Sequence, residues 1–264
     1  MPEGDSVHRV ARRLNDVLAG ADVTRFELRV PQAATVDLRG RVVHEVVPRG
    51  KHLLHRIGEH TLHSHLKMEG EWHVYRPGER WRKPAFTARA VVGTSQWETV
   101  GFDLAGIAVV ATADESRLVG HLGPDPLSAD WDPVEAARRL AADERPVHVA
   151  IQDQRNIAGF GNEYANEILF VRGILPTTPA RETDAAALVD LGARMIRANR
   201  DRPDRTFTGD TRPGRTTWVY RREGRPCRRC GTLIRGGSLG AAQRRERIVF
   251  WCPVCQAAPG ASAG

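Results

Sequence analysis

The alternation of apolar and polar residues divides the first half of the chain into a leading helix and a β-rich region. From residue 5 to residue 19, apolar residues recur at intervals of three and four, which predicts an amphipathic helix. Asp5 or Ser6 is its expected cap. From about residue 22 to 111, short alternating runs are separated by glycines, as in strands joined by turns. A leading helix followed by regular short strands favours a β-sandwich or flattened barrel.

The individual strands are expected where the alternation is unbroken. These runs are 42–47, 52–57, 61–66, 71–75, 87–92 and 107–112. The pattern becomes helical after Gly-Pro-Asp-Pro at 123–126. Helices are expected at 133–142, 146–152, 162–172 and 183–199.

These changes of pattern predict an α+β chain of several domains. We expect an N-terminal β-sandwich with a flanking helix at 1–128 and a helical domain at 132–217, with the boundary near 127–132. A small β-ribbon follows at 218–256, and the small polar residues of 257–264 are expected to form a disordered tail. A length of 264 residues suits two domains and a small module.

The composition is that of a soluble globular protein, with 41% hydrophobic and 27% charged residues. No apolar run approaches the roughly 18 residues that a membrane span requires, and the N-terminus lacks the apolar core of a signal peptide. We therefore expect a cytoplasmic protein that is a monomer and has no membrane partner.

The net charge of +7 is unevenly distributed. Arginines are concentrated between residues 194 and 229, and they recur at Arg244, Arg245 and Arg247. Such a surface attracts a polyanion, because neutralised phosphates release their counterions. An arginine-rich surface without a ligand is the alternative, and charge alone does not decide between them.

Four cysteines form two Cys-x-x-Cys pairs near the C-terminus: Cys227, Cys230, Cys252 and Cys255. Each pair has the spacing of a zinc knuckle, and two facing knuckles make a closed four-thiolate site. Disulfides or a redox-active dithiol are the alternatives, and both are less common inside cells. We expect one structural Zn²⁺, which would hold the loop that carries Arg247.

Pro2 and Glu3 stand directly before the leading helix. The initiator methionine is generally removed before a small residue, which would leave Pro2 with a free secondary amine that titrates near about 8. A neutral amine can attack an aldehyde or a sugar C1′ to form an iminium, and the adjacent carboxylate can transfer protons. An ordinary lead-in to a helix is the alternative interpretation of these residues.

Lys51 lies in a polar turn that opens a strand. Its ammonium could bind a phosphate or protonate a leaving base, or it could be one more exposed lysine. His60, His63 and His65 raise the possibility of a second metal site. No carboxylate or thiol accompanies them in the sequence, so this site is not favoured.

A glycine turn lies between two of the expected helices. Gly159 and Gly161 would let the backbone approach a ligand, and Asn162 could cap the next helix. The N–H groups at this helix terminus would then face a phosphate. An isolated Gly-x-Gly is also common in ordinary turns.

Several short motifs occur in the order found in one family of DNA repair enzymes. They are Pro-Glu-Gly at 2–4, Arg-Gly-Lys at 49–51, Ser-His-Leu-Lys-Met-Glu-Gly at 64–70, Leu-Gly-Pro-Asp-Pro-Leu at 122–127, Ala-Gly-Phe-Gly-Asn-Glu at 158–163 and the paired cysteines. Over nearly its whole length the chain resembles the formamidopyrimidine-DNA glycosylase/endonuclease VIII (Fpg/Nei) family, in particular the actinobacterial endonuclease VIII type called Nei2.

The resemblance implies a β-sandwich, a helix–two-turns–helix domain and a zinc finger, with damaged DNA bound between them. It implies that Pro2 is the nucleophile, that Glu3 is the acid and that Lys51 contacts the scissile phosphate and donates a proton. The residues that it implies for DNA binding are Met68, which fills the void left by the extruded base, the turn glycines Gly159 and Gly161, Asn162 and Arg247. It associates Arg247 with δ-elimination as well.

One segment departs from the family pattern. The Fpg branch carries an Arg-Phe pair that contacts the orphaned base and wedges the duplex, whereas residues 101–106 here, Gly-Phe-Asp-Leu-Ala-Gly, contain no arginine. This difference favours oxidised pyrimidines over 8-oxoguanine as substrates. It also favours activity on single-stranded or bubble DNA.

The resemblance therefore predicts a bifunctional DNA glycosylase and apurinic/apyrimidinic (AP) lyase of base excision repair, associated with the nucleoid when bound to DNA. It would remove oxidised bases and cleave the strand by β,δ-elimination. The alternatives are a non-catalytic zinc-ribbon protein that binds damaged DNA, and an AP lyase that releases no base.

Overall fold

The computed structural model describes residues 2–240 and 247–257. Its backbone contacts divide the chain into two compact units, which meet in the sequence between His121 and Leu122. This division lies a few residues before the boundary expected near 127–132. The reason is that Gly123 N donates to Gln154 O and Ala158 N donates to Pro124 O, which pairs the connecting segment with the second unit. The further division at 217/218 and the tail at 257–264 stay predictions, and residues 258–264 of that tail lie outside the described residues.

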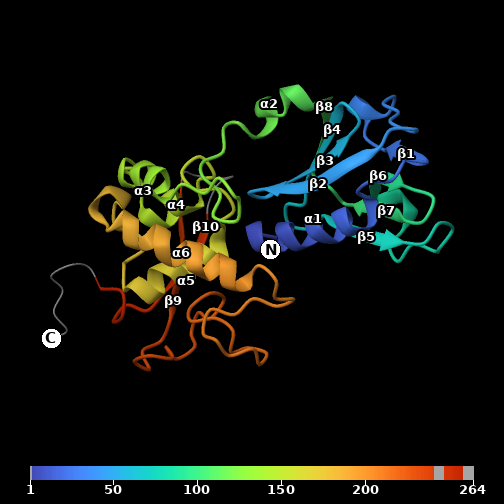
Figure 1. The fold of residues 1–264 in the computed structure, drawn as a ribbon. Coiled ribbons are helices and arrows are strands. Elements are labelled where there is room, and N and C mark those ends of the chain that lie inside the picture. Colours follow the sequence, from blue (N-terminus) through green and yellow to red (C-terminus); the bar gives the residue numbers. More distant parts are fainter. Residues whose placement is uncertain (1, 241–246, 258–264) are drawn as a thin grey trace. The chain divides into compact units, whose positions relative to one another are not determined.

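The first unit begins with α1 (Gly4–Leu18), as the apolar periodicity predicts (Figure 1). Its buried face is formed by Val7, Ala11, Leu14 and Leu18. The expected cap at Asp5 or Ser6 is wrong, because Glu3 is the N-cap residue. Ser6 acts from inside the first turn, where its hydroxyl accepts a hydrogen bond from Glu3 N at 2.9 Å.

Two antiparallel four-stranded sheets follow α1 in the sequence. One has the order β1-β6-β7-β5, with β1 (Arg25–Leu28), β6 (Ala88–Gly93), β7 (Glu98–Phe102) and β5 (Glu71–Tyr75). The other has the order β2-β3-β4-β8, with β2 (Val43–Arg49), β3 (His52–Ile57), β4 (His60–His65) and β8 (Gly106–Ala111), and a short helix α2 (Ser116–Val119) follows it. The six expected strands are present, whereas β1 and β7 were not predicted. All five residues of β7 are buried, so it lacks the alternation that marks a half-exposed strand.

One hydrophobic core joins α1 to both sheets. It contains Leu14 of α1, Leu53 and Leu62 of the second sheet and Val92 of the first, all of them fully or almost fully buried. A smaller cluster around Phe102 and Tyr75 packs beneath Trp81. Burial of such side chains stabilises each by roughly 1.5–3 kcal/mol relative to exposure, so packing rather than helix or strand propensity holds these elements together.

The strand register gathers several turns at one end of the first unit. In the second sheet His52 pairs with His65, which pairs with Gly106. In the first sheet Glu71 and Ala88 both pair with Phe102. Because the turns 66–70 and 103–105 each pass from one sheet to the other, these two rows lie at the same end of the unit. We call this end the rim; it comprises the turns 50–51, 66–70, 84–87 and 103–105.

The second unit is largely helical. Its helices are α3 (Pro133–Ala141), α4 (Val147–Gln152), α5 (Asn162–Arg172) and α6 (Ala185–Asn199), each within two residues of its expected bounds. A hairpin of β9 (Arg235–Leu239) and β10 (Arg247–Trp251) supplies the strands of the expected ribbon. Among the helices of the described ranges, none has both the length and the apolar character needed to cross a membrane.

His55 is a buried polar residue in the interior of the first unit. Its ring is fully buried, lies 4.8 Å from the Trp72 ring between centroids, and has no hydrogen-bond partner on either nitrogen within the described part of the chain. Burial lowers the pKa of His55 from 6.5 to about 4. The unfolded chain therefore takes up this proton first as the pH falls, and stability is lost between about pH 6.5 and pH 4.

Replacing His55 with leucine should reduce the acid sensitivity of the fold. The variant no longer needs to keep a neutral imidazole buried, so its free energy of unfolding should fall less between neutral pH and about pH 4.5, by about 2–3 kcal/mol relative to the unmodified protein. Urea denaturation at the two pH values measures this difference. The matched control is His60→Leu at an exposed position. Equal acid sensitivity in the unmodified protein and His55→Leu would contradict the assignment.

Candidate functional site

The N-terminus of α1 brings Pro2, whose nitrogen becomes a secondary amine once Met1 is removed, next to a buried carboxylate. Pro2 is half-buried, and Glu3, the N-cap residue, is completely buried. Pro2 also lines a cavity of about 300 Å³ together with Leu66, Gly70 and Glu71. The positive end of the helix dipole lies here, which disfavours protonation of a nearby amine. The arrangement suits an amine nucleophile that acts beside a proton-transferring group.

Lys51 is presented by a tight hairpin. Arg49 pairs with His52, so Gly50 and Lys51 alone form the connection between β2 and β3. Gly50 has a φ of +56°, a conformation that favours glycine and is required by the two-residue turns that match strand twist. The turn places Lys51 at the rim, directly before β3, the strand that pairs with β4.

Met68 lies at the apex of the 66–70 turn, and its side chain is 61% exposed. Gly70 N closes this turn by donating to Leu66 O at 2.9 Å. A Cβ atom at residue 70 would come within 2.5 Å of the same oxygen, so only glycine fits there. Since Pro2 shares its cavity with Leu66 and Gly70, the structure brings Pro2, Lys51 and Met68 to the same end of the first unit.

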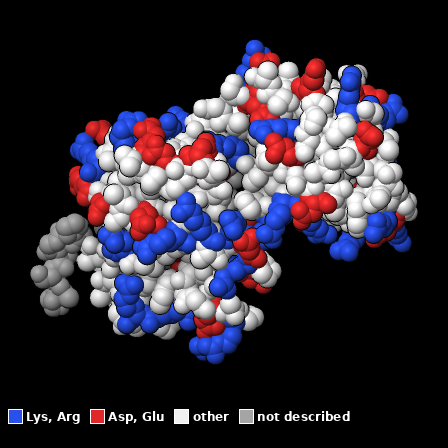
Figure 2. Space-filling view, in the orientation of Figure 1, with Lys and Arg blue, Asp and Glu red and all other residues white. Residues whose placement is uncertain are grey.

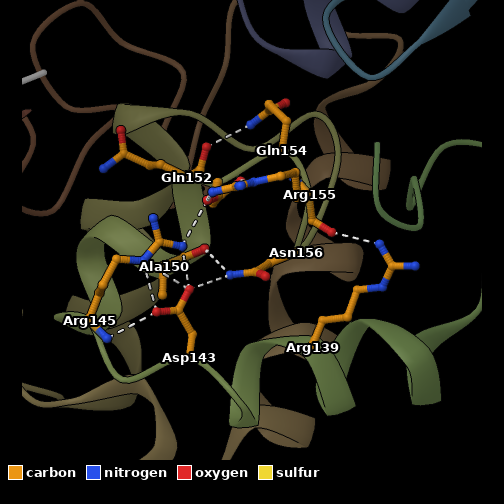
Figure 3. A network of polar contacts seen from close by, with 9 residues as sticks. Arg139, Asp143, Arg145, Ala150, Gln152, Gln154, Arg155 and Asn156 are labelled. Carbon is orange, nitrogen blue, oxygen red and sulfur yellow. Dashed lines mark hydrogen bonds and ion pairs between the residues drawn. The ribbon is translucent and has the colours of Figure 1, made fainter. Parts of the chain in front are cut away.

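In the second unit a polar network holds the segment before the glycine turn of α5, and Figure 3 shows its members between Arg139 and Asn156. Gln154 accepts a hydrogen bond from Gly159 N at 2.9 Å and donates to Phe160 O at 2.8 Å. Asn156, Asp143 and the arginines around them secure the preceding segment, for example through Asn156 Nδ2 donating to Ala150 O. The turn is therefore held from both sides by side chains rather than by regular secondary structure.

The two turn glycines and Asn162 differ in conformation. Gly159 has a φ of +95°, whereas Gly161 is extended and is the N-cap residue of α5. The expected cap at Asn162 is therefore wrong, because Asn162 is the first residue of the helix and is 7% exposed. The N-cap residue of α5 lies one position earlier than the sequence suggests, and that of α1 lies two or three positions earlier.

Asn162 and Arg247 are connected through α5. Asn166 Nδ2 donates to Asn162 O at 2.7 Å, and Asn166 Oδ1 accepts from Phe250 N of β10 at 2.6 Å. Burial lowers the pKa of His148 to about 4, a hydrogen bond with Asn162 opposes this shift, and the charge of Arg247 adds to it. Arg247, an exposed residue, therefore lies close enough for its charge to act on this group. Arg244 and Arg245 lie outside the described residues.

The four cysteine sulfurs form a compact cluster, with all ligand atoms within 4.8 Å of one another. Two Sγ–Sγ distances are 3.9 Å for Cys227–Cys255 and 3.4 Å for Cys230–Cys252. Tetrahedral zinc with Zn–S bonds of about 2.3 Å separates its sulfurs by about 3.8 Å. Backbone N–H groups also point at Cys227 Sγ and Cys252 Sγ, as they do in metal knuckles. The residues present therefore fit a four-thiolate metal ion.

The histidines of β4 take part in a different arrangement. His52 Nδ1 lies 2.7 Å from His63 Nε2, and the rings of His52 and His65 meet edge to face. Within the described ranges, the cysteines are the one group of three or more potential ligands close enough to share a metal ion. On the face drawn in Figure 2, Lys and Arg side chains lie on both units, with Asp and Glu between them.

Two domain descriptions match the sequence. The formamidopyrimidine-DNA glycosylase N-terminal domain matches residues 1–123, and the formamidopyrimidine-DNA glycosylase H2TH domain matches residues 122–197. The probable endonuclease 8 2 of Streptomyces coelicolor is 49% identical, over 100% of this chain and 97% of its own. The DNA-(apurinic or apyrimidinic site) lyase Nei2 of Mycolicibacterium smegmatis is 48% identical, over 98% of this chain and 100% of its own.

Solved structures show the same fold. MutM in complex with DNA containing carbocyclic 8-oxo-G superposes with a TM-score of 0.79, covering 97% of this chain and 99% of its own at 24% identity. The Lactococcus lactis Fpg bound to DNA with an abasic site has a TM-score of 0.78 at 22% identity, covering 97% of this chain and 100% of its own.

The chain belongs to the formamidopyrimidine-DNA glycosylase/endonuclease VIII family, as its ordered motifs predict. Within this family, its resemblance to the endonuclease VIII type called Nei2 is confirmed by full-length relatives that bear the names endonuclease 8 2 and Nei2.

Three residues of the second unit were not singled out in the sequence. His148, Asn166 and Glu167 are all completely buried although they are polar. The available signal was the pair Asn166-Glu167 inside the apolar run that ends at Phe170, where buried polar groups need partners. Glu167 has three such partners, because its carboxylate accepts hydrogen bonds from the backbone N–H groups of residues 218–220 at 2.8–3.0 Å.

Removing the Glu167 carboxylate should loosen the segment that leads into the ribbon. Glu167→Ala leaves three backbone donors without their acceptor, so the free energy of unfolding of the second unit should fall by about 3 kcal/mol or more. Urea denaturation followed by tryptophan fluorescence measures the loss, since Trp218 is one of the donors. Glu182→Ala, at an exposed position, is the control. A Glu167→Ala variant as stable as this control would show that the three hydrogen bonds contribute little.

Proposed function

We propose that this protein is a bifunctional DNA glycosylase/AP lyase of base excision repair that removes oxidised bases, pyrimidines above all. The observation that carries the proposal is the pairing of half-buried Pro2 with completely buried Glu3 beside a cavity at the N-terminus of α1. Membership in a family of DNA glycosylases and lyases supports it. The partner is damaged DNA, double-stranded and also single-stranded or in a bubble.

The reaction begins when the damaged nucleotide leaves the base stack, which costs least for a lesion that pairs poorly. The neutral Pro2 nitrogen attacks C1′ of the deoxyribose, and the bond to the base breaks. Glu3 transfers protons during ring opening and base departure. The resulting iminium withdraws electrons from the sugar, so a proton is lost from C2′ and the 3′-phosphate leaves in β-elimination. A second elimination releases the 5′-phosphate and leaves a gap.

The remaining site residues bind the DNA backbone or fill the space that the extruded base leaves. Lys51, Asn162 and Arg247 bind phosphates, and the N–H groups around Gly159 and Gly161 face the backbone at a helix N-terminus. Lys51 also donates a proton, and Arg247 takes part in δ-elimination. Met68, exposed at the apex of its turn, fills the void left by the extruded base.

The finer domain assignment belongs to the same proposal. The two sheets and α1 form a catalytic β-sandwich, residues 132–217 a helix–two-turns–helix domain, and residues 218–256 a zinc ribbon. One Zn²⁺ held by Cys227, Cys230, Cys252 and Cys255 has a structural role, since four thiolates leave no open position for catalysis. When bound, the ion fixes the ribbon that carries Arg247.

The preference for pyrimidines is supported by the shortness of the 103–105 turn, which carries Asp103, Leu104 and Ala105 and no arginine to contact an orphaned base. An AP lyase that releases no base is the second candidate, favoured by the name of the Mycolicibacterium smegmatis relative. Release of free oxidised base from a lesion-bearing oligonucleotide separates the two.

Borohydride should trap a covalent adduct between the protein and DNA that contains an abasic site, because it reduces the iminium on Pro2. A form with a retained N-terminal extension has no secondary amine at Pro2, so trapping and strand cleavage should fall by at least about 100-fold. Denaturing gel electrophoresis measures both products. The control carries the same extension followed by a cleavage site that regenerates Pro2. Full strand cleavage by the extended form would rule out the proline mechanism.

The protein should contain one zinc ion per chain, measured by elemental analysis. Cys252→Ser should lose the metal and weaken DNA binding by about 10-fold or more, because the ribbon no longer holds Arg247 in place. Cys252 is completely buried. The control variant is Ser128→Ala, a polar substitution in the second unit outside the four cysteines, which should keep the zinc ion. Unchanged zinc content in Cys252→Ser would contradict the four-thiolate site.

A further inference from the structure

Phe86 is the most exposed large hydrophobic residue of the first unit. Its side chain is 81% exposed, compared with 61% for Met68 and 39% for Val42, the other large apolar side chains exposed in the described part of this unit. A single exposed hydrophobic residue is often incidental. Phe86 differs from such residues in two respects: its turn lies at the rim, and hydrogen bonds hold the main chain of that turn in place.

The turn that carries Phe86 is held in place on both sides. Thr87 donates twice to Pro84 O, through its backbone N–H at 3.0 Å and its hydroxyl at 2.8 Å. Arg29 donates to the carbonyl of Ala85 at 2.9 Å, and Arg89 donates to the carbonyl of Phe86 at 2.8 Å. Two arginine side chains are therefore committed to the main chain of one short turn. This clamp fixes the main chain that presents the exposed ring of Phe86.

The turn lies at the rim, beside the 103–105 turn. Asp103 N donates to Thr87 O at 2.9 Å, and Lys83 forms an ion pair with Asp103 at 2.9 Å. On the other side of the 103–105 turn, Ala105 N donates to His65 O, immediately before the segment that carries Met68. The 103–105 turn itself presents no large apolar side chain, because Leu104 is 6% exposed and the exposed residue Ala105 carries only a methyl group. Met68 and Phe86 thus flank a turn that offers no wedge of its own.

We propose that Phe86 is a wedge that inserts its ring into the base stack beside the displaced nucleotide, a role that rests on the proposed function. A planar ring can stack on a base of any sequence, and apolar side chains inserted at a base step stabilise an unstacked duplex. Met68 occupies the void, and Phe86 stacks on the neighbouring base pair.

The surroundings of Phe86 favour DNA as its partner. The preceding residues include the exposed Arg80 and Arg82, which suit the phosphates that flank a base step. One isolated ring is far smaller than the several hundred square ångströms of apolar surface that mark a protein-binding patch. It does match the size of a single base.

Binding to a non-cleavable abasic analogue tests the wedge without requiring catalysis. The probe is a duplex with a tetrahydrofuran abasic site and a fluorescent 2-aminopurine at the adjacent base. Phe86→Ala should bind this duplex about 10-fold more weakly than the unmodified protein, and its 2-aminopurine signal should change much less on binding. Phe86→Tyr keeps the ring and should restore both.

The matched control is Val42→Ala, which shortens an exposed apolar side chain directly before Val43, at the end of β2 away from the rim. It should bind the duplex like the unmodified protein. If Phe86→Ala binds the duplex as the unmodified protein does, with the same 2-aminopurine response, the wedge is overturned while the proposed function stands. If the unmodified protein itself fails to bind abasic DNA, the proposed function fails and the wedge fails with it.

Discussion

The antiparallel register of the two sheets is the constraint on which the candidate active site depends. The turns 66–70 and 103–105 both cross between the sheets at the same end of the first unit. The strand pairings place the turns 50–51 and 84–87 at that end as well. A shift of one residue in either sheet would reverse the side chains of a whole strand and separate these loops. The positions of Lys51, Met68 and Phe86 therefore follow from pairings in the strands, which carry no catalytic chemistry themselves.

The second unit uses buried polar side chains for a similar purpose. Asn166 and Glu167 are adjacent on α5, and they bind backbone donors from two different segments of the ribbon region. Helix α5 begins at the glycine turn, so one rigid helix connects Asn162 at its first residue to Phe250 on β10. Buried hydrogen bonds of this kind fix geometry more than they add net stability, because each replaces a bond to water.

Much of the fold could be predicted from the sequence, because helices and half-exposed strands leave periodic patterns. The failures have physical causes. Strand β7 is buried throughout and shows no alternation, and both α1 and α5 are capped by a residue that precedes the expected polar side chain. The motif residues Pro2, Lys51 and the cysteines were identifiable by chemistry and spacing. Phe86 was not, since its exposure depends on a clamp of Arg29 and Arg89 that only the folded chain reveals.

The anchoring of residues 218–220 by Glu167 has a consequence for the cysteine cluster that follows them in the sequence. These residues precede the first cysteine by a few positions, and their attachment to α5 involves no thiolate. The start of the segment that carries the cysteines is therefore attached to the helix by bonds that do not depend on the state of the sulfurs. Any rearrangement of the cysteine cluster is then confined to the residues that follow this attachment, and the helix and the glycine turn at its start keep their geometry.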